Sequence, residues 1–220
     1  MSNYLYSLLA FDNNLQIRNQ QIKTFCKNGF NFCHFDVMDG IYVTNTAFNT
    51  FDLDLLFANQ VRIHVHLMVI DPINYIRKYI KYPINGLSFH FESQDIETNL
   101  ASLQLLKKHN IKAGLAIHPF VDINNYLTLL READYVTLMS VIPGKGGQTF
   151  LKETDDKLAK LISLRSRYNL NFAIEIDGGV NLEIIARYKN KINYYVSGSF
   201  LVQNIHQLAN IKKEFKELVK

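Results

Sequence analysis

The chain has 220 residues, of which 48% are hydrophobic and 20% are charged, and this composition is typical of globular proteins and excludes a disordered or fibrous chain. The formal net charge is +4, from 24 basic and 20 acidic residues. Because the basic residues are scattered outside the last ten positions, they favour small anionic ligands and not nucleic acid.

No apolar run approaches the ~20 residues of a membrane span, and residues 1–9 show neither a basic leader nor a cleavage site. A cytoplasmic protein with no membrane partner is therefore expected. The two cysteines, Cys26 and Cys33, have neither zinc nor redox spacing, so both are expected to be reduced core residues.

The predicted elements alternate between short strands and longer helices. β-Branched and aromatic runs predict eight strands, at Tyr4–Leu9, Phe32–Asp36, Val61–Leu67, Gly86–His90, Lys112–Ile117, Tyr135–Met139, Phe172–Asp177 and Tyr194–Ser197. Helical periodicity is clearest at Asn14–Asn28, Pro72–Tyr82, Ile96–Asn110, Glu153–Tyr168 and Val202–Val219. No linker or shift in composition divides them, so residues 1–220 are expected to form a single domain.

Eight strand–helix units in this length predict the α/β class and a (β/α)8 TIM barrel, whose active site lies at the carboxyl ends of the strands. An open doubly wound sheet is the alternative. That fold has fewer strands and a glycine-rich first crossover, and no such motif follows Tyr4–Leu9.

Polar residues stand at the predicted strand ends, where packing alone would favour branched apolar side chains. Strand alternation places His34 and Asp36 on one face of the second strand. His66 lies near the end of the third strand and Asp177 ends the seventh. Two nitrogen and two oxygen donors at one barrel mouth predict a site for one divalent metal ion, zinc, iron, manganese or cobalt. The alternative is a set of hydrogen-bonded residues that line the barrel.

Two carboxylates beside one metal also suggest paired acid–base chemistry. Asp36 and Asp177 can remove and return a proton next to a carbonyl, while the metal offsets the charge of the intervening enediolate. If the two carboxylates flank opposite faces of that planar intermediate, the stereocentre inverts. The expected reaction is then an epimerisation.

Three glycine-containing turns follow the last three strands, at Pro143–Gln148, Gly178–Val180 and Gly198–Ser199. Glycine permits positive φ and close approach of the backbone, so neighbouring N–H groups can converge on a phosphate. In TIM barrels the loops after strands seven and eight often hold one. The alternative is that each glycine only permits a tight turn.

Five motifs in order resemble those of the ribulose-phosphate 3-epimerase family along nearly the whole chain. They are HFDVMDG at 34–40, HLMV at 66–69, MSV at 139–141 leading into PGKGGQTF at 143–150, DGGV at 177–180, and GS at 198–199. The resemblance implies reversible epimerisation at C3 of D-ribulose 5-phosphate to D-xylulose 5-phosphate, a step of the pentose phosphate pathway. It also implies a homo-oligomer, with one metal ion in each subunit.

The resemblance implies roles for individual residues. Asp36 and Asp177 would exchange protons with the substrate, and the metal would be held by His34, Asp36, His66 and Asp177. Substrate contacts would come from Ser7, His66, Gly144, Lys145, Gly146, Gly147, Asp177, Gly178, Gly179, Gly198 and Ser199. The soft side chains of Met38, Met68 and Met139 would shield the enediolate from water, although methionines at such positions are also common in cores.

Several positions depart from the family pattern. Tyr6 replaces a proline, Thr44 replaces the proline of a V-P-N motif, and Lys145 replaces an aromatic residue in the loop expected to cover the substrate. His64 stands where the family often has an acidic residue. It is interpreted either as a deeper hydrogen-bonding residue or as a competing metal ligand.

Three other functions are weighed against this one. An epimerase of another ketose phosphate, such as D-allulose 6-phosphate, would use the same proton chemistry. A non-catalytic sugar-phosphate-binding barrel would be expected to have lost Asp36 or Asp177, and both are present. A decarboxylase related to orotidine-phosphate decarboxylase needs a D-x-K-x-x-D array, which the residues after Asp36 do not supply.

Overall fold

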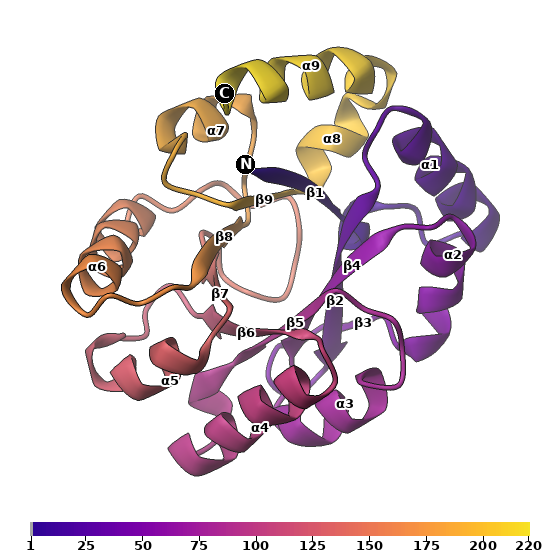
Figure 1. Ribbon diagram of the computed structural model, residues 1–220. Coiled ribbons are helices and arrows are strands. Elements are labelled where there is room, and N and C mark those ends of the chain that lie inside the picture. Colours follow the sequence, from indigo (N-terminus) through magenta and orange to yellow (C-terminus); the bar gives the residue numbers. More distant parts are fainter. Residues whose placement is uncertain (1) are drawn as a thin grey trace.

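Eight parallel strands form a closed ring inside a layer of helices in the computed structural model, which describes residues 2–220 (Figure 1). The strands, in order around the ring, are β1 (Asn3–Ser7), β2 (Phe32–Asp39), β4 (Arg62–Met68), β5 (Gly86–His90), β6 (Lys112–Ile117), β7 (Tyr135–Met139), β8 (Ala173–Asp177) and β9 (Tyr194–Ser197). β1 pairs with both β2 and β9, which closes the barrel. The predicted TIM barrel is confirmed, and the open-sheet alternative is wrong.

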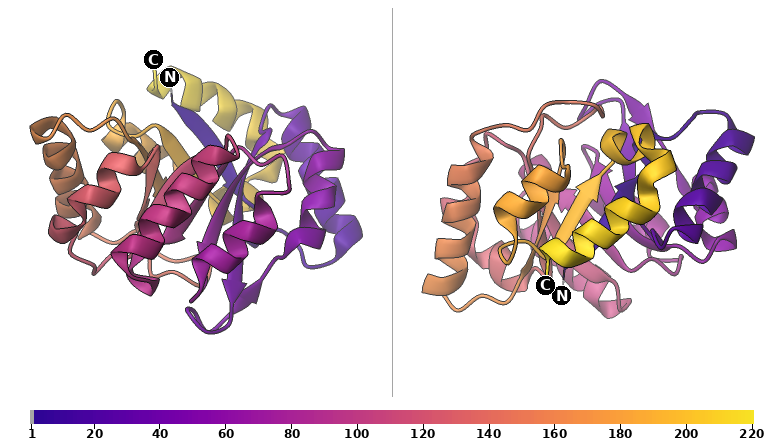
Figure 2. Two further views of the ribbon diagram at one scale, coloured as in Figure 1. Left: turned by 60° about the horizontal axis from the view of Figure 1, so that its bottom comes forward. Right: turned by 90° about the horizontal axis from the view of Figure 1, so that it is seen from above.

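One short strand departs from this pattern. β3 (Thr46–Ala47) pairs antiparallel with the end of β2, through Met38 and Asp39. The chain between β2 and β3 extends beyond the carboxyl ends of the barrel strands, at the opposite end of the molecule from the two termini (Figure 2).

The helices pack around the ring. They are α1 (Leu15–Lys27), α2 (Leu53–Ala58), α3 (Pro72–Tyr79), α4 (Ile96–Lys108), α5 (Leu127–Glu132), α6 (Thr154–Arg167), α7 (Leu182–Tyr188), α8 (Ser199–Gln203) and α9 (Leu208–Leu218). The local sequence explains where α1 begins and ends. The Asn14 side chain accepts hydrogen bonds from the backbone N–H groups of Gln16 and Ile17 at the start of α1. Gly29, with φ +80°, follows α1 as predicted.

The predicted single helix over Val202–Val219 is wrong. The structure instead has α8, a 3-10 turn over Ile205–Gln207, and α9. The backbone N–H and the side chain of Asn204 both donate to the carbonyl of Phe200, at 3.2 and 2.8 Å. These bonds close the last turn of α8 at Asn204, and the separate helix α9 begins at Leu208.

The main apolar core lies between the strands and the helices, because the outward-facing side chains of the strands, such as Phe35, Val65 and Leu67, are fully buried there. The barrel interior is more polar and is closed at its amino end by aromatic rings. The ring of Tyr135 fits because its neighbour is Gly114, where a Cβ atom would stand 2.4 Å from the Tyr135 ring. Because these aromatic rings fill the amino end of the barrel, the open end is the carboxyl end.

The structure of residues 2–220 bears on two further expectations from the sequence. Cys26 and Cys33 are free, with Cys33 buried and Cys26 half-buried. Within residues 2–220, no helix has the length and apolar character needed to cross a bilayer.

Candidate active site

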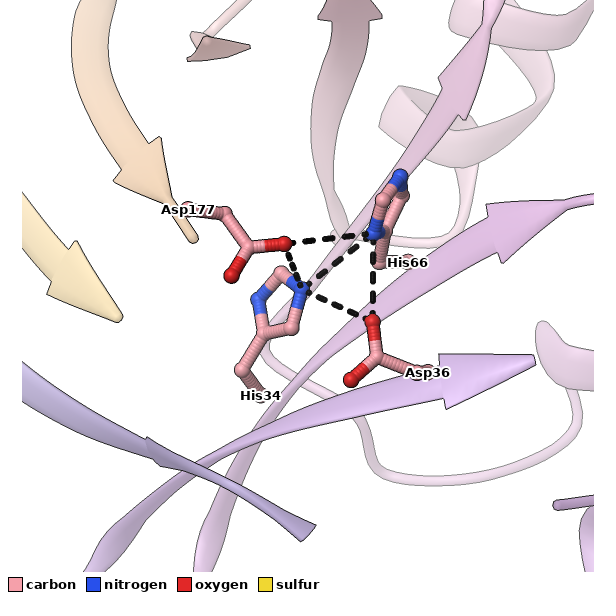
Figure 3. A group of neighbouring side chains, drawn as sticks. All are labelled: His34, Asp36, His66 and Asp177. Atoms are coloured by element: carbon pink, nitrogen blue, oxygen red, sulfur yellow. Dashed lines mark hydrogen bonds and ion pairs between the residues drawn. The ribbon is translucent and has the colours of Figure 1, made fainter. Parts of the chain in front are cut away.

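Four of the side chains singled out in the sequence converge at the carboxyl end of the barrel (Figure 3). His34 Nε2 lies 3.3 Å from Asp36 Oδ1 and 3.4 Å from Asp177 Oδ2. His66 Nδ1 lies 3.3 Å from Asp36 Oδ1 and 3.8 Å from Asp177 Oδ2. One donor atom from each of the four residues lies within 4.8 Å of the others.

The strand register explains this convergence. Asp36 of β2 is the direct neighbour of His66 of β4, and His34 of β2 neighbours Ser7 of β1. Because side chains alternate along a strand, these residues all point into the barrel. Asp177 ends β8, so that its side chain meets the cluster from the other side (Figure 3).

The electrostatics of the cluster favour bound positive charge. Burial lowers the pKa of His34, but the carboxylates of Asp177 and Asp36 outweigh burial and raise that pKa well above its usual range. Burial raises the pKa of Asp36, and the opposing charge and hydrogen bond of His34, together with the neighbouring His66, lower it overall. Two carboxylates held this close are stabilised by a positive charge between them.

The donor set fits a divalent metal ion. It consists of two imidazole nitrogens and two carboxylate oxygens on three strands, and three of the four residues are buried. Zinc, iron, manganese and cobalt accept such mixed ligands, whereas magnesium and calcium prefer oxygen alone. The structure therefore has a cluster that could hold a metal ion.

The second aspartate of the HFDVMDG motif does not belong to this cluster. Asp39 accepts backbone hydrogen bonds from Ile41, Tyr42 and Ile70. Burial raises the pKa of Asp39, but these backbone bonds outweigh burial and lower it. Asp39 therefore holds the turn after β2 against the end of β4.

A pocket opens above the cluster, and most of the predicted substrate-binding residues line it. Its walls include Ser7, Asp36, Met38, Met68, Met139, Gly144, Lys145, Gly146, Gly147, Asp177, Gly178, Gly179, Gly198 and Ser199. His34 and His66 lie beneath this lining and are fully buried. The hydroxyl of Ser7 donates a hydrogen bond to Asp36 Oδ2 at 2.9 Å, and this bond orients the carboxylate.

The predicted phosphate turns lie side by side on the pocket wall. Gly178 and Gly179 have φ of +113° and +65°, and a Cβ on Gly179 would stand 2.7 Å from the backbone nitrogen of Phe150. Glycine is therefore required at this turn. The Ser140 hydroxyl holds the turn in place through contacts to the carbonyls of Asp177 (2.8 Å) and Gly178 (2.6 Å).

Lys145 lies on the exposed part of the loop between β7 and α6. The Gln148 side chain donates to the carbonyls of Ile142 and Lys145 and so ties the two sides of this loop together. Asn45 donates to the carbonyl of Gly144 at 2.6 Å. The segment between β2 and β3 therefore meets the glycine loop at the rim of the pocket.

His64 lies below the cluster and is not one of its donors. Its Nδ1 is 2.8 Å from Glu175 Oε2, and its ring stacks on Tyr135 with centroids 4.7 Å apart. Glu175 Oε1 lies 3.4 Å from Nδ1 of His34 and accepts a hydrogen bond from Thr137. Of the two interpretations of His64, the deeper hydrogen-bonding residue is confirmed.

Sequence reasoning missed a second polar group, behind His66. His66 Nε2 contacts Nε2 of His90 at 3.1 Å, His90 Nδ1 contacts Glu92 Oε1 at 3.1 Å, and the Tyr42 hydroxyl donates to the same oxygen at 2.7 Å. His90 was visible as a polar residue at a strand end. Glu92 and Tyr42 carried no such signal, because they lie in a 3-10 turn and in a loop.

Comparison with known proteins gives a consistent family match. A family model described as the ribulose-phosphate 3 epimerase family matches residues 5–202. The chain is 33% identical over 189 residues to a ribulose-phosphate 3-epimerase from Mycoplasma pneumoniae, which covers 86% of this chain and 85% of the relative. It is 30% identical over 226 residues to the enzyme of that name from Buchnera aphidicola, with 100% and 97% coverage.

Solved structures with the same fold include more distant proteins. A tryptophan synthase structure from Mycobacterium tuberculosis has a TM-score of 0.70 at 12% identity and covers 99% of this chain and 92% of its own. A tryptophan synthase alpha-subunit from Pyrococcus furiosus has a TM-score of 0.67 at 15% identity, with 99% and 97% coverage. At this identity the likeness shows the barrel fold alone.

Proposed function

The chain belongs to the ribulose-phosphate 3-epimerase family, whose members are isomerases, and on that premise we propose that it interconverts D-ribulose 5-phosphate and D-xylulose 5-phosphate by inversion at C3. The observation that carries the proposal is the position of two carboxylates. Asp36 and Asp177 come from β2 and β8, and both line the same pocket. A substrate in that pocket would lie within reach of two proton-transfer groups.

Asp36 and Asp177 divide the proton transfer between them. In one direction Asp36 removes the proton from C3, which is acidified by the neighbouring carbonyl, and Asp177 delivers a proton to the opposite face. In the reverse direction the two exchange roles. The hydrogen bond from Ser7 to Asp36 Oδ2 holds this carboxylate in one orientation, which favours transfer from a fixed direction.

His34, Asp36, His66 and Asp177 would hold one divalent cation, zinc, iron, manganese or cobalt. When bound, such a cation offsets the negative charge of an enediolate. The buried histidines would serve as ligands, while the second oxygen of each aspartate would remain for proton transfer.

The remaining pocket residues bind and shield the substrate. Gly144–Gly147, Gly178, Gly179, Gly198 and Ser199 line the pocket, and their backbone N–H groups would bind the phosphate, with Lys145 adding a positive charge at the rim. Met38, Met68 and Met139 are almost fully buried on the pocket wall. Their apolar side chains keep water from the reacting carbons.

The test is turnover in deuterated water. The purified protein is reconstituted with each of the four metals and given D-ribulose 5-phosphate, and NMR follows both deuterium at C3 and the formation of D-xylulose 5-phosphate. Deuterated xylulose 5-phosphate is the expected product. Exchange without inversion would mean that only one carboxylate acts. If neither signal appears, the proposal is wrong, and the same assay with D-allulose 6-phosphate asks whether a longer ketose is the substrate.

A further inference from the structure

A row of polar side chains that do not line the substrate pocket extends from the candidate metal site. It starts at His66 and continues through His90 to Glu92, with contacts of 3.1 Å and 3.1 Å. Tyr42 ends the row with its hydroxyl 2.7 Å from Glu92 Oε1. The rings of His66 and His90 are fully buried, and the Glu92 side chain is 21% exposed. None of the last three residues has a part in the proposed proton transfer.

When both rings are neutral and a metal ion separates His66 Nδ1 from the carboxylates that it faces, the row allows one direction of hydrogen bonding. A carboxylate only accepts hydrogen bonds, so His90 must carry its proton on Nδ1 to donate to Glu92. His90 Nε2 then has a lone pair and accepts from Nε2–H of His66. His66 Nδ1 is consequently left unprotonated, and this is the atom that faces Asp36 and Asp177.

The opposite direction would remove His66 from the donor set. If His90 carried its proton on Nε2, its Nδ1 lone pair would face a carboxylate oxygen at 3.1 Å, which is repulsive. His66 would then carry its proton on Nδ1, and a protonated nitrogen cannot bind a metal. Glu92 therefore excludes the form of His66 that cannot act as a ligand.

Packing alone does not account for Glu92. Its Oε2 is buried and has no hydrogen-bond partner among residues 2–220, and an unpartnered buried polar atom costs stability. A glutamine or an apolar residue would fill the same space without a buried charge. Tyr42, by contrast, packs its ring on His90 with centroids 4.8 Å apart and donates its hydroxyl to the carboxylate, so it keeps Glu92 in position.

We propose that His90 and Glu92 are positioning residues that hold His66 in the tautomer able to bind the metal ion through Nδ1, and that Tyr42 orients Glu92. The inference rests on the proposed function in one respect, the presence of a metal at the four-residue cluster. It predicts that changes at Glu92, which does not touch the cluster, weaken metal binding. Second-layer partners of metal-bound histidines typically contribute about 10–100-fold to affinity.

The experiment measures histidine tautomers and metal affinity in the full chain. Nitrogen-15 NMR of labelled histidines in the Zn²⁺-bound protein reads the protonated nitrogen of His66 and His90, and calorimetric titration of the metal-free protein with Zn²⁺ measures binding. The variants are Glu92→Leu, Glu92→Gln and Tyr42→Phe, each checked for folding by circular dichroism. Tyr168→Phe is the matched control, because Tyr168 follows the end of α6, at the other end of the barrel from the cluster.

We expect Nδ1-protonated His90 in the wild-type protein and a loss of Zn²⁺ affinity of about 10–100-fold in Glu92→Leu. Glu92→Gln retains an acceptor oxygen and should lose less Zn²⁺ affinity than Glu92→Leu. Tyr42→Phe should lose less affinity than Glu92→Gln, and Tyr168→Phe should bind Zn²⁺ as the wild-type protein does. Unchanged Zn²⁺ affinity and an unchanged His90 tautomer in Glu92→Leu would overturn the inference, as would a wild-type His90 protonated on Nε2. A wild-type protein that binds Zn²⁺ with the expected tautomers but does not epimerise would overturn the proposed function and support this inference.

Discussion

His64 and Glu175 form a buried pair inside the barrel, with Nδ1 of the histidine 2.8 Å from Oε2 of the carboxylate. Burial raises the pKa of Glu175, and the opposing attraction of His64 and the hydrogen bonds from His34 and His64 lower it overall. The other oxygen of Glu175 lies 3.4 Å from Nδ1 of His34. The pair therefore supports one ligand of the candidate metal site from below, on the side away from the substrate pocket.

The first prediction concerns the stability of this pair. His64→Leu should lower the free energy of unfolding by about 3–5 kcal/mol, because it leaves a buried carboxylate without its main partner. The double variant His64→Leu/Glu175→Leu should recover part of that loss. Urea unfolding of the wild-type protein, His64→Leu, Glu175→Leu and the double variant forms a double-mutant cycle that measures the coupling energy of the pair. His109→Leu, at an exposed histidine, is the control and should change the free energy of unfolding little. If His64→Leu has an effect as small as that of the control, the pair does not contribute to stability.

The second prediction concerns the two proposed proton-transfer groups. Asp36→Asn and Asp177→Asn should each lower turnover by about 10²–10⁴-fold or more, because each loses a proton-transfer group and a metal ligand. Steady-state assays in both directions, with metal content measured for every sample, check this. Asp156→Asn, at an exposed position in α6, should keep full activity. Near-normal turnover of either variant with metal bound would remove that aspartate from the mechanism.

The sequence allowed the barrel and the four-residue cluster to be predicted because both depend on local patterns. Strand alternation alone placed His34 and Asp36 on one face, and four of the eight predicted strands, among them Gly86–His90, have the bounds of the structure. α5 and α7 were missed because six and seven residues are too few to show a clear helical period.

Contacts between distant elements could not be predicted in the same way. Tyr42 and Glu92 are 50 positions apart, and neither stands at a strand end. His64 could be named as unusual, but its partner Glu175 lies 111 positions away. Only the barrel register decides which of several buried polar residues His64 meets.

The third prediction concerns Lys145, which lines the pocket from an exposed loop. Lys145→Ala should raise KM by more than it lowers kcat, because the ammonium group acts on the phosphate in both the ground state and the transition state. Lys145→Phe restores the aromatic residue of the family pattern and tests whether shape can replace charge. Lys152→Ala, at an exposed lysine near the end of the same loop, is the control. An unchanged KM in Lys145→Ala would exclude Lys145 from the phosphate site.

The fourth prediction compares two glycines of the pocket. Gly179→Ala should destabilise the protein by about 1–3 kcal/mol and raise KM, because φ is +65° and the added methyl would stand 2.7 Å from the backbone nitrogen of Phe150. At Gly146 nothing lies within 4 Å of such a methyl, so Gly146→Ala should unfold at the same temperature as the wild-type protein. Thermal unfolding of both variants checks this, and equal melting temperatures would contradict the strained turn.

The fifth prediction concerns pH and a lysine far from the pocket. Burial, together with the charges of Lys216 and Arg62, lowers the pKa of Lys212 from 10.5 to about 8, and its Nζ lies 4.6 Å from the centre of the Phe30 ring. Between these two pKa values the unfolded chain holds a proton that the folded protein has lost, so this group makes stability rise with pH across that window. Lys212→Met removes this contribution. Urea unfolding at intervals from pH 7.5 to pH 9.5 should show the variant's stability relative to the wild-type protein falling as pH rises, while exposed Lys213→Met stays parallel to wild type. A constant difference between Lys212→Met and wild type would mean that Lys212 titrates near its ordinary pKa.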